Sequence, residues 1–366
     1  MIIHAWLIHL SHKLTQSRFW LLKATLLFTS VALFFAFPSY ESLNPEEWTE
    51  LFRKATQPFI NSNAGDGSHD AKLSFRFFVP LIVRLLHLNI TGVLVLSAIA
   101  GISNFYLISA ISNKILQNKQ QAFLTGLCVA FIYAGKCAFI ELRGTIFDSI
   151  AIFFLLASLY INNNLVRAIM LFAGAWCDER ALIASSLIWV YFFVLSNKTG
   201  IKGFFTSNAI SIYVVWAVYF IIRLWLASAY GLKTDTDGTG LDVLLNQINN
   251  IPIGTWSALE GLWLLLIAAF ILLYIQKQVL QLLVFFIACA IVLLAGLSVL
   301  DITRSVAYLL PAVFTCLLVL QRYFDKNKID RLLWYALLLC FAYPAYYTGG
   351  KSSIWWTYPL PLQLLR

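Results

Sequence analysis

The sequence has little charge and no soluble part. Asp, Glu, Lys and Arg make up 12% of the 366 residues, whereas hydrophobic residues make up 60%, and the mean hydropathy is +0.79. A soluble domain needs far more polar surface, because charged residues normally form about a quarter of a soluble chain. Internal repeats are absent too, which argues against a transporter built from two inverted halves. The protein is therefore expected to be embedded in a membrane.

Disulfide and metal-ligand patterns are also missing from the sequence. The six cysteines show no C-x-x-C spacing and lie in or beside apolar stretches, which indicates small packing residues. Residues 234–240 alternate Asp with other residues as a calcium loop does, but the twelve-residue pattern and its terminal Glu are absent. The sequence therefore indicates no metal and no cofactor, while a divalent metal stays open.

Long apolar runs are what the sequence does contain. They recur along the whole chain, and each is about long enough to cross the ~30 Å hydrocarbon layer as a helix. Because the runs are apolar all round, they do not fit the alternating strands of a barrel. Residues 168–196 are interrupted by the polar segment 177–180 and predict two short helices that meet at a polar tip. The other predicted spans are 19–37, 91–111, 122–140, 146–161, 204–228, 253–275, 281–300, 305–321 and 332–348. We therefore expect an all-α, polytopic integral membrane protein, with residues 1–366 as a single transmembrane domain of about 11 membrane helices.

Lys and Arg in the short loops predict the orientation, because basic loops stay in the cytoplasm. With the N-terminus inside, 13 basic residues share the cytoplasmic side with Asp325 and Asp330. The other 13 basic residues share the outer side with 15 acids, so positive-inside topology accounts for the net charge of +9. No nucleic-acid partner is implied, since there is no soluble basic domain. Acids gathered on the outer side indicate that the protein acts there.

The longest stretch without a span is residues 38–90, which we expect to form the first periplasmic loop. Residues 44–59 begin with Asn-Pro and acids, and their apolar residues recur at helical spacing. This pattern predicts an amphipathic helix on the membrane surface, and we expect Glu41, Glu46, Glu47 and Glu50 to form a solvated helix start. Residues 61–70 predict a polar turn. Residues 72–88 predict a second interfacial helix, because two arginines in the bilayer core would each cost ~2.5 to 3.5 kcal/mol.

An outer loop of interfacial helices around an acidic turn, directly after the first span, resembles the architecture of the GT-C superfamily of multi-pass glycosyltransferases. In that superfamily the first external loop carries an acidic catalytic residue, and the sugar donor is usually a polyprenyl-linked phosphate or diphosphate. The loop has no Asp-Asp pair; its nearest equivalents are Glu46-Glu47 and the single residues Asp66 and Asp70. The resemblance implies a periplasmic transferase that uses a lipid-linked sugar.

Such a transfer needs a carboxylate to take the proton of the acceptor and cations to stabilise the leaving phosphate. Asp70, beside His69 and two residues before Lys72, is the first candidate for the base, and Asp66 is the second. His69 and Lys72 are candidates for substrate binding. The alternative is that both aspartates cap or solvate a surface turn.

Further candidates for substrate binding come to the outer level from distant parts of the sequence. Arg76, Arg180 and Arg304 are candidates for the phosphate, because a guanidinium offers a planar fork to phosphate oxygens. The alternative for Arg180 and Arg304 is an ion pair with neighbouring acids. Lys136 either meets the lipid phosphate or, as we expect, snorkels outward. The set is completed by two residues next to the spans, Arg143 and Glu179.

The sequence thus predicts a membrane glycosyltransferase, and other functions stay open. The partners are a polyprenyl-linked sugar donor, a glycan, lipid or protein acceptor, and membrane lipids. We expect a bacterial inner-membrane protein with its active site in the periplasm. A polysaccharide polymerase or ligase is one alternative, and a lipid-linked glycan transporter or flippase is another. A membrane partner without catalytic activity is the third.

Overall fold

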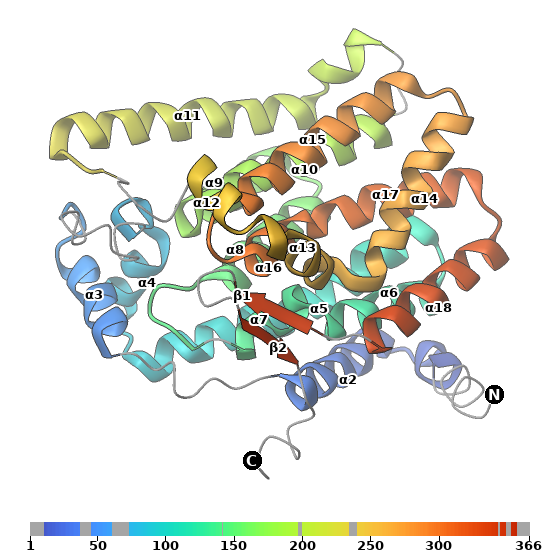
Figure 1. The fold of residues 1–366 in the computed structure, drawn as a ribbon, viewed down its shortest axis with the longest axis horizontal. Coiled ribbons are helices and arrows are strands. Elements are labelled where there is room, and N and C mark those ends of the chain that lie inside the picture. Colours follow the sequence, from blue (N-terminus) through green and yellow to red (C-terminus); the bar gives the residue numbers. More distant parts are fainter. Residues whose placement is uncertain are drawn as a thin grey trace.

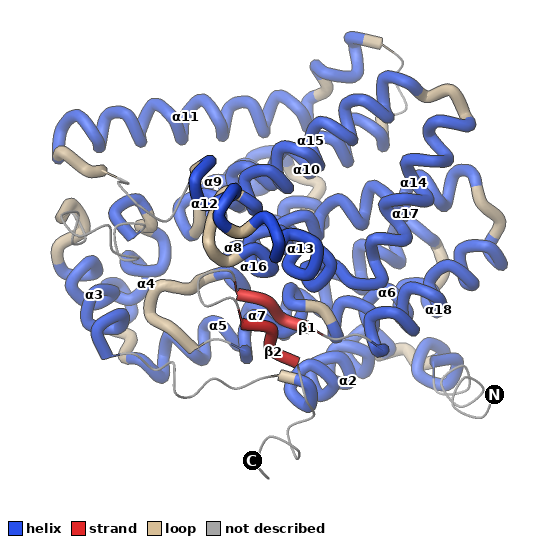
Figure 2. Tube along the Cα trace, in the orientation of Figure 1, coloured by secondary structure: helices blue, strands red, loops and turns tan. Residues whose placement is uncertain are grey.

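The structure, a computed structural model, describes residues 11–36, 45–60, 73–140, 142–196, 200–233, 240–342, 345–348 and 353–356. These residues are almost entirely helical, apart from one small antiparallel hairpin (Figure 2). The hairpin pairs β1 (Ala345–Thr348) with β2 (Ser353–Trp356). The main helices are α2 (Trp20–Phe35), α3 (Pro45–Thr56), α4 (Phe78–Leu86), α5 (Ile90–Leu116), α6 (Lys119–Phe131), α7 (Tyr133–Ile140), α8 (Asp148–Tyr160), α9 (Asn164–Cys177), α10 (Glu179–Leu195), α11 (Ser207–Tyr230), α12 (Leu241–Asn246), α13 (Ile251–Leu259), α14 (Trp263–Ile275), α15 (Val279–Leu297), α16 (Ile302–Val306), α17 (Leu310–Tyr323) and α18 (Lys326–Ala342).

Five helical segments are long and apolar enough to cross a membrane: 90–116, 207–230, 248–275, 279–297 and 302–323. The pair α6 and α7, bent by 49°, makes a sixth if it counts as one span. The other predicted spans are also helical but shorter. At 1.5 Å per residue, the 13 residues of α8 and the 14 residues of α9 extend roughly 20 Å each, less than the ~30 Å hydrocarbon layer. The protein is therefore a helical, multi-span membrane protein.

Two predicted boundaries can be compared directly with the structure. The polar tip within 168–196 is confirmed, because α9 ends at Cys177 and α10 begins at Glu179, with Asp178 between them. The predicted span 332–348 is wrong at its end, since α18 stops at Ala342 and residues 345–348 form strand β1. Pro344 in the sequence explains the stop, because proline disfavours helical backbone at the residue before it.

Polar residues lie at opposite ends of the same helices, as the sequence predicts. At one end of α10, Arg180 meets Asp148, while at the other end the carbonyl of Val194 accepts a hydrogen bond of 3.0 Å from Arg322. The 17 residues of α10 separate these contacts by roughly 25 Å. Lys114 donates to Asn162 over 2.9 Å at the predicted cytoplasmic end, so residues assigned to one side do meet.

The centre of the bundle is α17, whose membrane-crossing window with α16 is entirely buried. It packs against α5, α10 and α14, and α5 in turn packs against α2, α6 and α8. The six cysteines are buried and form no disulfide, as the sequence predicts. In Figure 1, α11 runs along one edge of this bundle, and its C-terminal end approaches α3 and α4. There the rings of Phe59 and Tyr230 stack at 4.2 Å.

Residues 45–60 and 73–86, part of the predicted first outer loop, are held against the bundle by buried polar contacts. Lys54 of α3 is fully buried, donates to the carbonyl of Ser74 over 2.9 Å and lies 4.5 Å from the ring of Phe77. Glu47 accepts a hydrogen bond of 2.9 Å from Thr145, and Glu50 pairs with Arg53 at 2.7 Å. The expectation that Glu47 and Glu50 are solvated is therefore wrong: Glu47 bonds to Thr145 in the loop before α8, and Glu50, 6% exposed, pairs with Arg53 within α3. The predicted helices of this loop are present as α3 and α4.

Candidate functional site

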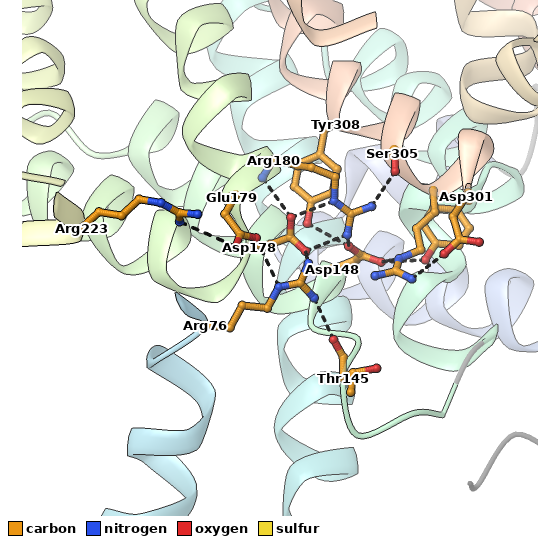
Figure 3. Close-up of polar contacts among 12 residues, drawn as sticks. Arg76, Thr145, Asp148, Asp178, Glu179, Arg180, Arg223, Asp301, Ser305 and Tyr308 are labelled. Carbon is orange, nitrogen blue, oxygen red and sulfur yellow. Dashed lines mark hydrogen bonds and ion pairs between the residues drawn. The ribbon is translucent and has the colours of Figure 1, made fainter. Parts of the chain in front are cut away.

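Three arginines and two aspartates from distant parts of the chain form a buried network at one end of the bundle (Figure 3). Arg76 precedes α4, and Asp178 lies between α9 and α10. Asp148 is the first residue of α8, Arg180 lies in the first turn of α10, and Arg304 belongs to α16. The polar residues thus sit at helix ends, where apolar runs begin.

Asp148 is the centre of this network, and its side chain is fully buried. One carboxylate oxygen accepts hydrogen bonds from Arg304 over 2.5 Å and from Tyr133 over 2.9 Å. The other oxygen accepts from Arg180 over 2.8 Å and from Tyr308 over 2.9 Å. A carboxylate has about four acceptor positions, so these bonds fill it. Asp148 therefore orients the two arginines and has no position left to take a substrate proton.

The acceptor positions of the Asp178 carboxylate are occupied in the same way. It caps the N-terminus of α10 by accepting from the backbone N–H of Arg180 over 3.0 Å, as aspartate often does at this position. Its side chain also pairs with the guanidinium of Arg180 at 2.7 Å and with Arg76 at 3.0 Å. Burial raises the pKa of Asp178, but Arg180 and Arg76 lower it by more, and it stays well below its usual range. This carboxylate holds two guanidinium groups in place.

Glu179 differs from both aspartates, because its side chain is 28% exposed and its contacts are long. One of its oxygens lies 3.4 Å from Nε of Arg76, and the other lies 3.8 Å from Arg223. These distances leave acceptor positions of the carboxylate unfilled. Among the described residues of this network, Glu179 is thus a carboxylate that can reach both solvent and two guanidinium groups.

The charges of the network do not balance within its buried part. Three cations, Arg76, Arg180 and Arg304, face two fully buried aspartates. The remaining positive charge is met at the rim, where Glu179 approaches Arg76, and Asp301, 25% exposed, pairs with Arg304 at 3.0 Å. Anionic groups at the rim therefore compensate a buried surplus of positive charge.

The sequence predicts that Arg76, Arg180 and Arg304 come together, and the structure brings them together. Each arginine also has partners within the protein. For Arg180 and Arg304 these ion pairs are the alternative that the sequence left open. Arg180 donates to Ser305 over 2.8 Å in addition to its aspartates, and Arg76 donates to the carbonyl of Thr145 over 2.9 Å. As they stand, these guanidinium groups are committed to the protein.

The other predicted site residues have different positions. The candidate bases Asp66 and Asp70, with His69 and Lys72, lie outside the described residues. Arg143 is 3.9 Å from Glu47 and so belongs to the contact between α3 and the loop before α8.

Lys136 does not snorkel outward, because it is 1% exposed. It lies on α7, and the buried Glu260 acts on it electrostatically. The expectation of snorkelling is therefore wrong: seven of the eight residues of α7 are buried, so Lys136 lies among protein side chains.

The predicted site residues did not include several residues of the site, among them Asp148, Asp178, Asp301, Tyr133, Tyr308 and Arg223. Asp148 could have been found from the sequence, because it begins an apolar run and an acid at the start of a buried helix needs a partner. Tyr308 follows Arg304 by four residues and so lies on the same face of the helical segment. Tyr133 carried no such signal.

A cavity of about 570 Å³ lies beside Glu179 and opens along α11. Two cations line it, Arg223 and Lys233, and the rest of its wall is apolar. The guanidinium of Arg223 lies 3.9 Å from the ring of Phe75 and donates to Tyr219 over 2.8 Å. In Figure 3, Arg223 reaches towards Glu179 from the opposite side to Arg76. Arg223 thus links the cavity, which it lines, to Glu179 at the rim of the buried network, 3.8 Å away.

Within the described part of the chain, no group of three or more His, Cys, Asp or Glu side chains is arranged to hold a metal ion. No protein-family model matches the chain, and no curated protein or solved structure is significantly similar to it.

Proposed function

We propose that the chain is a GT-C-like glycosyltransferase of the bacterial inner membrane, with about 11 membrane helices, a cytoplasmic N-terminus and a periplasmic active site. It transfers a sugar from a polyprenyl-linked phosphate or diphosphate to a periplasmic or lipid-linked acceptor. The observation that carries this proposal is Glu179, a partly exposed carboxylate between the guanidinium groups of Arg76 and Arg223.

The reaction needs a base and a cationic partner for the leaving group, and both kinds of residue meet here. A carboxylate takes the proton of the acceptor hydroxyl, and the acceptor oxygen forms a bond to the anomeric carbon. The bond from that carbon to the phosphate oxygen breaks, and the phosphate leaves with the electron pair. Positioned cations stabilise the charge that develops on it. Asp70 stays our proposed base from the sequence, and Glu179 is the described carboxylate best placed for the same task.

The buried network gives this site its rigidity. Asp148 and Asp178 fix the arginines through short, charge-assisted hydrogen bonds, so the cationic groups need little rearrangement when charge develops on a substrate. Rim carboxylates keep the surplus charge compensated until an anionic substrate arrives. This division between saturated and accessible carboxylates supports the proposal.

Cells that carry Glu179→Gln or Asp70→Asn test the proposal through their surface glycan and the turnover of lipid-linked sugar. We expect glycan to be lost in at least one variant while the protein reaches normal membrane levels. Asp325→Asn, which removes an exposed carboxylate near the other end of the bundle, is the matched control and retains activity. Normal glycan in both test variants refutes the proposed base.

A lipid-linked glycan transporter is the second candidate, because two buried ionisable residues lie at helix breaks. Lys136 follows the 49° bend between α6 and α7, and Glu260 stands between α13 and α14 with a left-handed φ of 45°. Broken helices that carry ionisable groups are typical of transport sites. Flipping of a fluorescent lipid-linked sugar in proteoliposomes separates the two functions: a transporter loses it in Glu260→Gln, and a transferase does not flip at all.

A further inference from the structure

The cavity beside Glu179 combines two cations with a lipid-facing apolar wall. Among the spans in the described part of the chain, α11 is the least covered, since only 28% of its membrane-crossing window is buried. Its residues Phe220 and Leu224, which line the cavity, are 52% and 70% exposed. The apolar wall is thus continuous with the side of a membrane helix that faces lipid. Arg223 and Lys233 lie where this wall ends.

We propose that this cavity binds the phosphate headgroup of a membrane lipid. Arg223 and Lys233 contact the phosphate, and Phe220 and Leu224 contact the first part of the lipid chain. A guanidinium and an ammonium group supply the charge-assisted donors that phosphate oxygens prefer. The cavity volume of about 570 Å³ lies in the range that binds small ligands. The inference rests on the proposed function only in naming a polyprenyl phosphate as the lipid.

The apolar wall favours a lipid over a soluble phosphate. A soluble anion gains nothing from Phe220 and Leu224, whereas a lipid chain buries apolar area against them. The ring of Phe75 is 3% exposed and holds the Arg223 guanidinium at 3.9 Å, so this cation is positioned before a ligand arrives. The geometry therefore fits a headgroup that enters sideways from the membrane.

Binding at this position acts on Glu179. Arg223 lies 3.8 Å from Glu179, too far for a hydrogen bond, so a phosphate that makes direct hydrogen bonds to Arg223 draws its charge away from the carboxylate. Glu179 then keeps Arg76 as its cationic neighbour, at 3.4 Å. A phosphate bound to Arg223 thus lies beside the carboxylate of Glu179.

Equilibrium binding to the purified full-length protein tests the assignment. The probes are a polyprenyl phosphate, the corresponding polyprenol, inorganic phosphate and vesicles of phosphatidylglycerol. We expect the polyprenyl phosphate to bind best, and Arg223→Gln and Lys233→Gln each to weaken it about tenfold or more, the usual worth of a charge-assisted hydrogen bond. Lys328→Gln, which removes an exposed cation near the other end of the bundle, leaves binding unchanged.

Three results overturn the assignment. The first is that polyprenol binds as well as polyprenyl phosphate. The second is that phosphatidylglycerol or inorganic phosphate binds as well as polyprenyl phosphate. The third is that Arg223→Gln and Lys233→Gln bind polyprenyl phosphate as well as the wild type does. Thermal unfolding of each variant shows that it is folded, and Arg223→Lys provides a milder change if Arg223→Gln is not. Selective binding without any sugar transfer sinks the proposed function alone, whereas transfer that is indifferent to both cations sinks the lipid site alone.

Discussion

Replacement of Asp148 by Asn should destabilise the protein strongly, because this change removes the negative charge at the centre of the network. The wild-type carboxylate accepts from Arg180, Arg304, Tyr133 and Tyr308. The amide of Asn has the same shape, but its NH₂ group points a donor at groups that are themselves donors. Arg304, 3% exposed, and Arg180, 15% exposed, cannot turn to bulk water to compensate.

The size of the effect follows from the cost of an uncompensated buried charge. Removing one partner of a buried ion pair costs about 3–5 kcal/mol. Each kcal/mol shifts the melting temperature of a domain of a few hundred residues by roughly 2–4 °C, so we expect a fall on the order of 10 °C. Thermal unfolding of the purified protein in detergent, followed by intrinsic fluorescence, measures it.

Two further variants control this experiment. Asp325→Asn makes the same chemical change in a pair whose side chains are 55% and 62% exposed, and such surface pairs contribute about 0–1 kcal/mol. Combining Asp148→Asn with Arg304→Gln should cost less than the sum of the two single changes, because the second change removes the stranded cation. If Asp148→Asn melts within a degree or two of the wild type, the network does not stabilise the fold as argued here.

Three other outcomes are expected. The pKa of Asp178 is lowered in the folded protein, so the stability that this carboxylate contributes is complete above its ordinary pKa of 3.8 and is lost as the pH falls below that value. The stability difference between wild type and Asp178→Asn should therefore be constant from neutral pH to about 5 and shrink in acid. A difference that already shrinks near pH 6 contradicts this. Burial lowers the pKa of Lys54 from 10.5 to about 8, so the free energy of unfolding should rise as the pH increases from about 8 to 10.5. Lys54→Met should flatten that rise. An equal rise in both proteins argues against a lowered pKa of Lys54. Tyr308→Phe removes one hydrogen bond to the Asp148 carboxylate and should cost about 1.5–3 kcal/mol in thermal unfolding, with unchanged stability as the contrary result.

The membrane helices could be predicted because apolar runs alone specify them. A run that is apolar all round has to be helical in lipid, where backbone groups have no water to bind. The sequence therefore placed α5, α11 and α15 correctly, and it located the tip at Asp178 from charged residues inside an apolar stretch. The hairpin of β1 and β2 was missed, because its first strand continues an apolar run that reads as helix.

The partners of the arginines could not be predicted in the same way. Asp148 and Arg304 are 156 residues apart, and no local pattern connects them. Assigning charges to predicted membrane sides restricted the possible partners, since both residues fall on the predicted outer side. The pairing itself depends on how α8 packs against its neighbours, which is a property of the fold. The position of Glu179 between Arg76 and Arg223 could not be predicted either, because its distances to them depend on how the neighbouring helices pack.

Sugar transfer by the purified protein in proteoliposomes tests the central claim most directly. The measurement is the release of polyprenyl phosphate from a polyprenyl-phosphate sugar, with wild type, Glu179→Gln and Asp325→Asn side by side. We expect release by wild type and Asp325→Asn; where Glu179 rather than Asp70 is the base, Glu179→Gln loses at least about a hundredfold of it, as for removal of a general base. Equal release by Glu179→Gln and wild type contradicts the role of Glu179, and no release by any of the three contradicts the proposed transferase.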